Sequence, residues 1–178
     1  DAMIREFKEE TGAMVKDWEL FAEIPNPYIA FFVSHQPANI RSVEVWEKLY
    51  REFKYELAEN SSVRLYHGDS PDILPMMMAD ITEPATIFLD AHAAVDGKDR
   101  EKYGKSPVVF ELEVIKKHPI KNHTIMVDDI DDFDAGQYDD VNGPITSEMI
   151  KAKIKDINPN YNFKKYGEEG HTILVAHL

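Results

Sequence analysis

The chain contains no cysteine, so it has no disulfide framework and no thiol that could act as a nucleophile or a metal ligand. A reducing cytoplasm is the simplest compartment for such a protein, and we expect a cytoplasmic location. No apolar run approaches the roughly 20 residues that a membrane span requires. No signal peptide is visible, although the sequence begins at Asp1 rather than at a methionine, which leaves an upstream segment open.

Basic residues are scarce. Lysine and arginine number 20 against 33 acidic residues, which gives a net charge of −13. A surface this acidic repels phosphate backbones, so neither nucleic acid nor a membrane is an expected partner. Acidic residues are concentrated at 127–134 and 138–140, and we interpret 138–140 as a solvated loop.

The length of 178 residues predicts one domain spanning 1–178, without a linker or repeat. Within it, residues 1–27 form an N-terminal segment, because apolar residues at mostly helical spacings predict an amphipathic helix over 2–22. Two prolines, Pro25 and Pro27, end this segment.

Strand and helix patterns alternate through the rest of the chain. Strands are predicted at 28–34, 40–45, 63–66, 85–89 and 123–127, and in a hairpin of 161–166 and 172–177. Helices are predicted at 46–59, after the N-cap pairs Ser70-Pro71 and Ser106-Pro107, and around 149–157. This alternation predicts an α/β fold: a Rossmann-like, mostly parallel sheet with helices on both faces and a C-terminal antiparallel hairpin.

Acidic side chains stand at the ends of four successive predicted strands. The candidate ligand-binding residues at these strand ends are Glu44, Asp69 in "HGDS", Asp90 and His92 in "LDAH", and Asp128 and Asp129 in "VDD". Ligands of open parallel sheets bind at the carboxyl ends of the strands. The pattern therefore predicts one acidic, ligand-binding edge of the sheet.

The segments "IRSVEVWEKLY", "VRLYHGDSPDILP", "ATIFLDAH", "SPVVFELEVI", "HTIMVDDI" and "INPNYNF" resemble the class I S-adenosylmethionine-dependent methyltransferases. The resemblance runs from about Ile40 to the C-terminus. It implies that Glu44 accepts hydrogen bonds from the two ribose hydroxyls of S-adenosylmethionine. It also implies that Gly68, Asp69 and Ser70 lie at the adenine and that Asp90 lies beside the sulfonium.

Three carboxylates, those of Asp90, Asp128 and Asp129, are expected to converge at two neighbouring strand ends. Such a cluster repels strongly unless a cation lies between the acids or one of them is protonated, and an all-oxygen cluster without cysteine suits Mg²⁺, Mn²⁺ or Ca²⁺ rather than zinc. This resembles the metal-dependent O-methyltransferases, in which the ion binds the acceptor hydroxyl and lowers its pKa. In this chain His92 would then be the base that accepts the proton of the hydroxyl. The competing interpretation is that Asp129 caps a turn, only Asp128 reaches the edge, and His92 closes a loop.

The glycine-rich first motif of such folds is not found where it is expected. A parallel crossover needs a dozen or more residues, and residues 35–39 supply five, so 28–34 and 40–45 cannot be ordinary parallel neighbours. Three explanations stand: residues are missing from this sequence, Glu10-Thr11-Gly12 is the motif and 28–35 an inserted or edge segment, or the motif is lost.

The favoured function is therefore transfer of a methyl group from S-adenosylmethionine to a hydroxyl of a small molecule or sugar. The alternative is a methyltransferase-like binding module without catalysis, and a weaker third is another nucleotide-dependent enzyme that uses the same acids. The sequence identifies neither the acceptor nor the oligomeric state.

Overall fold

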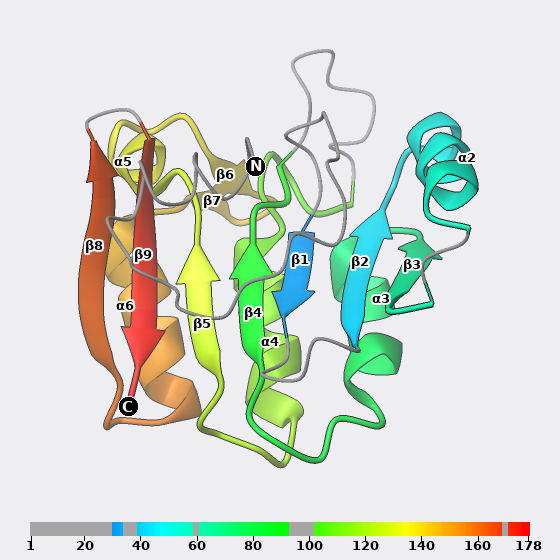
Figure 1. Cartoon of the computed structure of the whole chain (residues 1–178). Coiled ribbons are helices and arrows are strands. Elements are labelled where there is room, and N and C mark those ends of the chain that lie inside the picture. Colours follow the sequence, from blue (N-terminus) through cyan, green and yellow to red (C-terminus); the bar gives the residue numbers. More distant parts are fainter. Residues whose placement is uncertain (1–29, 34–38, 59–60, 93–101, 169–170) are drawn as a thin grey trace.

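The structure is a computed structural model, and it describes residues 30–33, 39–58, 61–92, 102–168 and 171–178. The predicted helical segment 1–27, which includes Glu10-Thr11-Gly12, lies outside these residues. Within them the chain forms a mixed α/β fold around one seven-stranded sheet, as the alternating sequence pattern predicts (Figure 1).

The strands lie in the order β3-β2-β1-β4-β5-β9-β8. Their bounds are β1 (Ala30–Val33), β2 (Ile40–Glu44), β3 (Val63–His67), β4 (Thr86–Leu89), β5 (Thr124–Val127), β8 (Asn162–Glu168) and β9 (His171–His177). Each lies within two residues of its predicted position. The last two strands pair antiparallel along their length, as the hairpin signal around 167–170 predicts.

Most strands share one direction, although only two of the six neighbouring pairs in this sheet are parallel. The pairs β2–β3 and β4–β5 are parallel, whereas β1 and β9 run antiparallel to the strands on both of their sides. Consequently β2, β3, β4, β5 and β8 all point the same way. The predicted "mostly parallel" sheet is thus correct for strand direction, while the inserted β1 and β9 make most neighbouring pairs antiparallel.

The central strand β1 explains the short connection to β2. Its backbone pairs Phe32 with Arg41 of β2 on one side and with Ile87 of β4 on the other, both antiparallel. The prediction that these segments are not parallel neighbours is confirmed, because antiparallel strands need only a short connection. The strand is central, so the idea that 28–35 is an edge segment is wrong.

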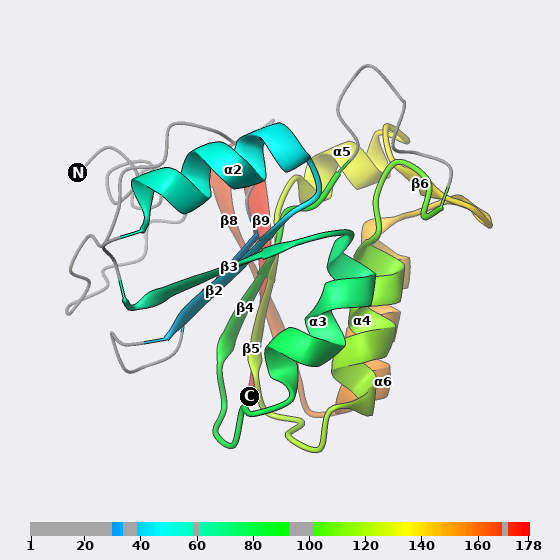
Figure 2. The same ribbon diagram turned by 90° about the vertical axis from the view of Figure 1, so that its right-hand side faces the viewer.

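Helices cover the sheet unevenly. One face carries α3 (Ser70–Met78), α4 (Val108–Lys117) and α6 (Ser147–Ile157), and α2 (Glu47–Glu56) lies on the other side by β2 and β3 (Figure 2). In the described part of the chain, none of the helices has both the length and the apolar character that crossing a membrane would require.

The core lies between the sheet and the helices α3, α4 and α6. Helix α6 buries Ile150, Ile154 and Ile157 at helical spacing, and Thr146 caps it by accepting a hydrogen bond from the Met149 amide at 3.3 Å. Helix α3 begins one residue earlier than predicted, because Asp69 rather than Ser70 occupies the N-cap position.

Two short elements near the acidic edge were not predicted. Helix α5 (Ile130–Asp134) follows β5 and buries Ile130 and Phe133, and β6 (Asp139–Asp140) pairs with β7 (Gly143–Pro144). The acids at 138–140 therefore do not form a simple solvated loop: Asp139 accepts backbone hydrogen bonds from Lys105 and Ser106 at 2.8 and 3.0 Å.

Candidate functional site

The shared direction of β2, β3, β4 and β5 brings their carboxyl ends to one edge of the sheet (Figure 1). The predicted acids all lie at this edge, directly at or after the last residue of each strand. They separate into two groups. Glu44 lies with Gly68, Asp69 and Ser70 at the β2–β3 end, and the others lie at the β4–β5 end.

Glu44 is buried, with 3% of its surface exposed, although it is a carboxylate at a strand end. One oxygen, Oε1, accepts a hydrogen bond from the Trp46 amide at 2.7 Å, while Oε2 is buried and has no partner among the described residues. Burial raises the pKa of Glu44, and the Trp46 and Val45 amides oppose that rise. The unsatisfied oxygen is the kind of group that a ligand hydroxyl would satisfy.

Two apolar side chains lie open to solvent next to this buried acid. Val45 and Trp46 are 41% and 38% exposed. Exposed apolar groups beside a buried, half-satisfied carboxylate combine a hydrophobic contact surface with a polar anchor.

The turn after β3 is tied directly to Glu44. The Gly68 amide donates to the Glu44 carbonyl oxygen at 3.1 Å, and Gly68 adopts φ of 141°, a conformation open to glycine. Ser70 follows as the first residue of α3, and its buried hydroxyl has no hydrogen-bond partner among the described residues. The structure therefore places the predicted adenine-binding residues beside the predicted ribose-binding acid.

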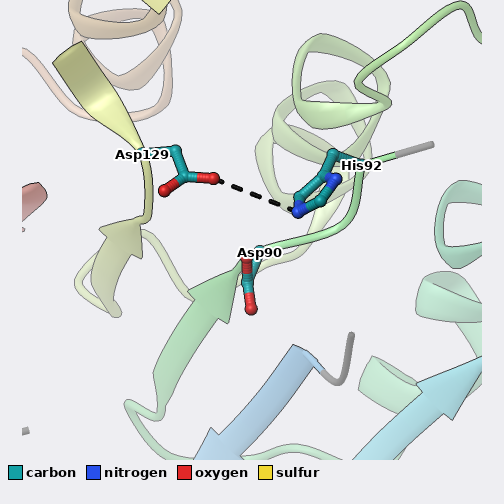
Figure 3. A group of neighbouring side chains, drawn as sticks. All are labelled: Asp90, His92 and Asp129. Atoms are coloured by element: carbon teal, nitrogen blue, oxygen red, sulfur yellow. Dashed lines mark ion pairs between the residues drawn. The ribbon is translucent and has the colours of Figure 1, made fainter. Parts of the chain in front are cut away.

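At the other end, the side chains of Asp90, His92 and Asp129 form a cluster (Figure 3). One potential ligand atom of each lies within 4.8 Å of the others, and His92 Nε2 is 4.0 Å from Asp129 Oδ2. Asp90 follows β4, His92 stands in the next loop, and Asp129 follows β5. Of the three carboxylates predicted to converge, Asp90 and Asp129 lie in this group, whereas Asp128 does not, and a nitrogen donor from His92 joins the two acids instead.

Asp129 has an unusual backbone. Its φ of 52° and ψ of 33° lie in the left-handed region, where it is the one non-glycine residue with positive φ among those described. It occupies the N-cap position of α5, yet its side chain makes no capping hydrogen bond. Instead Asp129 Oδ2 accepts a hydrogen bond from the Tyr138 hydroxyl at 2.9 Å and faces His92. Asp129 is therefore aimed into the cluster.

Asp128 lies next to the cluster without belonging to the closest group. Its amide donates to the Leu89 carbonyl oxygen at 3.1 Å, which joins the ends of β4 and β5. It lines the same small cavity as the cluster. The other lining residues are Leu89, Asp90, Ala91, His92, Ser106, Val108, Glu111, Asp129, Phe133 and Tyr138. The sequence grouped Asp128 with Asp90 and Asp129, whereas the tightest group in the structure contains His92.

Glu111 is a buried carboxyl that lines this cavity. Its exposed fraction is 1%, and its Oε2 has no hydrogen-bond partner among the described residues. Burial raises the pKa of Glu111 to about 7, and the nearby Ser70 hydroxyl opposes the rise. Although the Ser70 hydroxyl lies close to the Glu111 carboxyl, neither Ser70 Oγ nor Glu111 Oε2 forms a hydrogen bond with any described residue.

The loop at 102–106 packs against β6, the short strand that directly follows Tyr138. Gly104 has φ of 82° and packs so closely that a Cβ would lie 2.5 Å from the Asp140 Cα. Burial and the Asp129 carboxylate raise the pKa of Tyr138, which keeps its hydroxyl protonated as a donor.

Sequence reasoning missed Tyr138 and Glu111. Tyr138 stands in an acidic stretch without any periodicity, so nothing local predicted its direction. Glu111 did carry a signal, because it falls on the apolar stripe of Val108, Leu112 and Ile115, and an acid on a buried helix face needs a reason.

No protein-family model matches this chain, and a search of curated proteins finds no similar sequence.

Proposed function

We propose that this protein is an S-adenosylmethionine-dependent methyltransferase that acts on a hydroxyl of a small molecule or sugar. The observation that carries the proposal is Glu44, a buried carboxylate whose Oε2 has no partner among the described residues. Burying such a group is unfavourable unless a ligand completes its hydrogen bonds.

A ribose would complete them. Its two adjacent hydroxyls can both donate to one carboxylate, and Val45 and Trp46 offer apolar surface for the attached base. Gly68, Asp69 and Ser70 follow the neighbouring strand, in a turn that donates a hydrogen bond to the Glu44 carbonyl. These residues fit a nucleoside, the adenosine half of the proposed cofactor.

The strand order supports the same location. The order β3-β2-β1-β4-β5 is that of doubly wound, Rossmann-like sheets, in which ligands bind outside the carboxyl strand ends where the order reverses. Glu44 and Asp90 end the strands on either side of β1, at this reversal. A ligand spanning it would place its nucleoside at Glu44 and its reactive end at Asp90.

The chemistry at the Asp90 end requires that an acceptor oxygen lose its proton as the methyl group moves. Positioning acceptor and sulfonium in line supplies most of the rate gain in such a transfer. His92, held opposite the Asp129 carboxylate, could act as base or could ligate a cation together with Asp90 and Asp129. A bound Mg²⁺ or Mn²⁺ would act as a Lewis acid that lowers the pKa of the hydroxyl.

One observation favours the second candidate function, a binding module without catalysis. Strand β1 runs antiparallel to β2 and β4, so its carboxyl end at Val33 lies at the edge of the sheet opposite Glu44 and Asp90. The carboxyl end of β1 is where such folds carry the glycine-rich loop, and here it lies away from the edge with the candidate residues. Contacts to the methionine half of the cofactor would have to come from other segments.

Two measurements separate the candidates. Calorimetry with S-adenosylmethionine and its demethylated product tests cofactor binding, and we expect dissociation constants in the micromolar range. Transfer of a labelled methyl group to a panel of sugars and other hydroxylated compounds then tests catalysis. Binding without any transfer would favour the module, and no binding of either compound would contradict both the enzyme and the cofactor site.

A further inference from the structure

The imidazole of His67 connects the end of β3 to the residues that lead into α2. Its Nε2 lies 3.2 Å from the Val45 carbonyl oxygen, and its ring stacks on that of Tyr50, with the ring centroids 4.9 Å apart and an interplanar angle of 25°. We propose that His67 is a positioning residue of the nucleoside site, whose Nε2–H group holds Val45 and Trp46 against Glu44. This inference rests on the proposed function for the identity of the ligand, whereas the positioning can be tested without a ligand.

The pairing of β2 with β3 brings His67 to this place. The two strands are parallel, and their register sets Glu44 beside His67 as the last residue of each strand. The backbone connection ends there, where the Gly68 amide donates to the Glu44 carbonyl oxygen at 3.1 Å. The His67 side chain reaches one residue further, to the Val45 carbonyl oxygen. It therefore extends the connection between the strands beyond their last paired residues.

The contact with Val45 determines which ring nitrogen of His67 carries a hydrogen. A backbone carbonyl oxygen can only accept a hydrogen bond, so Nε2 must be the donor, and we assign the hydrogen to it. In the neutral ring Nδ1 then carries no hydrogen, and Nε2–H is the single donor of the side chain. A substitution that keeps a donor can therefore be compared with one that keeps only an aromatic ring.

Helix α2 has little of its own that fixes where it begins. Trp46 occupies the N-cap position and makes no side-chain capping hydrogen bond, although such a bond is the usual way to fix the start of a helix. Phe53, nearly two turns further along, is the one buried residue of α2. The two contacts of His67, with the Val45 carbonyl and with the ring of Tyr50, lie at the end of α2 that has no cap. They hold the start of the helix against β3.

The start of α2 carries the groups that surround the proposed ribose. The Trp46 amide donates to Glu44 Oε1 at 2.7 Å, and Oε2 is the oxygen without a partner among the described residues. Val45 and Trp46 also supply the apolar surface beside this carboxylate. A shift of these two residues would change both the direction of the carboxylate and the surface offered to a base. His67 therefore affects ligand binding through Val45 and Trp46.

Hydrogen exchange of the Trp46 amide, followed by nuclear magnetic resonance, tests the positioning without a ligand. His67→Phe keeps an aromatic ring for Tyr50 and removes the donor, whereas His67→Gln restores an N–H donor on a side chain of similar length. Exchange should be roughly three- to tenfold faster in His67→Phe, the change expected from one lost hydrogen bond, and within about twofold of the original rate in His67→Gln. An unchanged rate in His67→Phe, or equally fast exchange in both variants, would overturn the proposal.

Binding of S-adenosylmethionine to the same variants, measured by calorimetry, connects the positioning to the proposed function. The dissociation constant should rise roughly three- to tenfold in His67→Phe and stay within about twofold of the original value in His67→Gln. His177→Phe, the same substitution at the end of β9, is the matched control and should bind as the unsubstituted protein does. Equal dissociation constants for His67→Phe and His177→Phe would overturn the proposal.

The unsubstituted protein offers a test that needs no variant. Nitrogen-15 resonances of the His67 ring distinguish its two neutral forms, and we expect the form with hydrogen on Nε2. Hydrogen on Nδ1 alone would contradict the proposal, because Nε2 would then have nothing to donate to Val45. His67 is exposed, so its substitutions should leave the core intact. Circular dichroism verifies folding, and the ring resonances remain decisive if a variant does not fold.

The outcomes separate this inference from the proposed function. Faster Trp46 exchange in His67→Phe, with no binding of S-adenosylmethionine to any of the proteins, would support the role of His67 and contradict the methyltransferase. Cofactor binding that is equally tight in His67→Phe and in the control would contradict the role of His67 while supporting the Glu44 site.

Discussion

The Tyr138 hydroxyl donates a hydrogen bond of 2.9 Å to Oδ2 of Asp129, the same oxygen that lies 4.0 Å from His92 Nε2. This contact orients the carboxylate of a residue whose backbone is already held at positive φ. The direction of Asp129, and with it the shape of the cluster, therefore depends on a tyrosine nine residues further along the chain.

Replacing Tyr138 with phenylalanine should weaken Mn²⁺ binding about ten- to a hundredfold, because contacts that orient a metal ligand typically have effects of this size. Calorimetry on the metal-free variant measures it. Tyr55→Phe, at a side chain that is 86% exposed, is the control and should bind as the unsubstituted protein does. A dissociation constant for Tyr138→Phe within about twofold of that of the control would show that the contact does not orient the site.

Gly104→Ala should destabilise the protein more than Gly136→Ala. Both glycines have positive φ, at 82° and 75°, but a Cβ at Gly104 would meet the Asp140 backbone at 2.5 Å while one at Gly136 meets nothing within 4 Å. Gly136→Ala should lower the free energy of unfolding by about 1 kcal/mol, and Gly104→Ala by roughly 2–3 kcal/mol. Urea titration distinguishes them, and equal losses would mean that the 102–106 loop does not pack on β6 as described.

Glu111→Gln should stabilise metal-free protein at alkaline pH. Folding raises the pKa of Glu111 from 4.5 to about 7, so its contribution to stability is complete below pH 4.5 and is lost as the pH rises through 7. Glutamine does not ionise. The difference in free energy of unfolding between the variant and the unsubstituted protein should therefore shift in favour of the variant by up to about 3 kcal/mol between pH 4 and pH 8.

The control for this experiment is Glu113→Gln on the same helix. Glu113 forms an ion pair with Lys153 at 2.7 Å, which lowers its pKa, so its loss should be slightly destabilising at pH 8. If Glu111→Gln were destabilising at pH 8 as well, the Glu111 carboxyl would have to be ionised and paired in the folded protein.

His123 should show the opposite pH dependence. It is buried, its Nδ1 accepts a hydrogen bond from the Ala85 amide at 3.1 Å, and its Nε2 lies 3.0 Å from His118 Nδ1. Burial, with His118 and Lys121 nearby, lowers the pKa of His123 from 6.5 to about 4. Its contribution to stability is therefore complete above pH 6.5 and falls by about 3 kcal/mol as the pH drops through 4.

Nuclear magnetic resonance can follow the ring protons of His123 during an acid titration. We expect a midpoint at about 4, if the protein stays folded, and earlier unfolding otherwise. A midpoint near 6.5 in folded protein would show that the ring is not held neutral by its surroundings.

The sequence predicted the seven strands of the large sheet well because they are short, largely apolar runs bounded by turn residues, and each lies within two residues of its predicted place. It also predicted that Asp90 and Asp129 converge, because neighbouring parallel strands end at one edge. It did not predict the direction of β1, since strand polarity depends on which neighbours a segment pairs with rather than on its own residues.

The composition of the cluster of Asp90, His92 and Asp129 was harder to predict. Loop residues such as His92 and Tyr138 are oriented by long-range contacts that leave no periodic pattern in the sequence. Asp129 enters the cluster because its backbone adopts a left-handed conformation, which redirects its side chain. Spacing alone could not distinguish the roles of Asp128 and Asp129.

The most direct test of the account is the binding of S-adenosylmethionine to Glu44→Ala, measured by calorimetry beside Glu47→Ala. Glu47 is an acid three residues away, exposed in the first turn of α2 and paired with Arg51. Loss of the Glu44 carboxylate should weaken binding by about 2–3 kcal/mol, roughly 30- to 150-fold, while Glu47→Ala binds as the unsubstituted protein does. Equal binding by both variants would show that Glu44 does not hold the ribose and would contradict the proposed cofactor site.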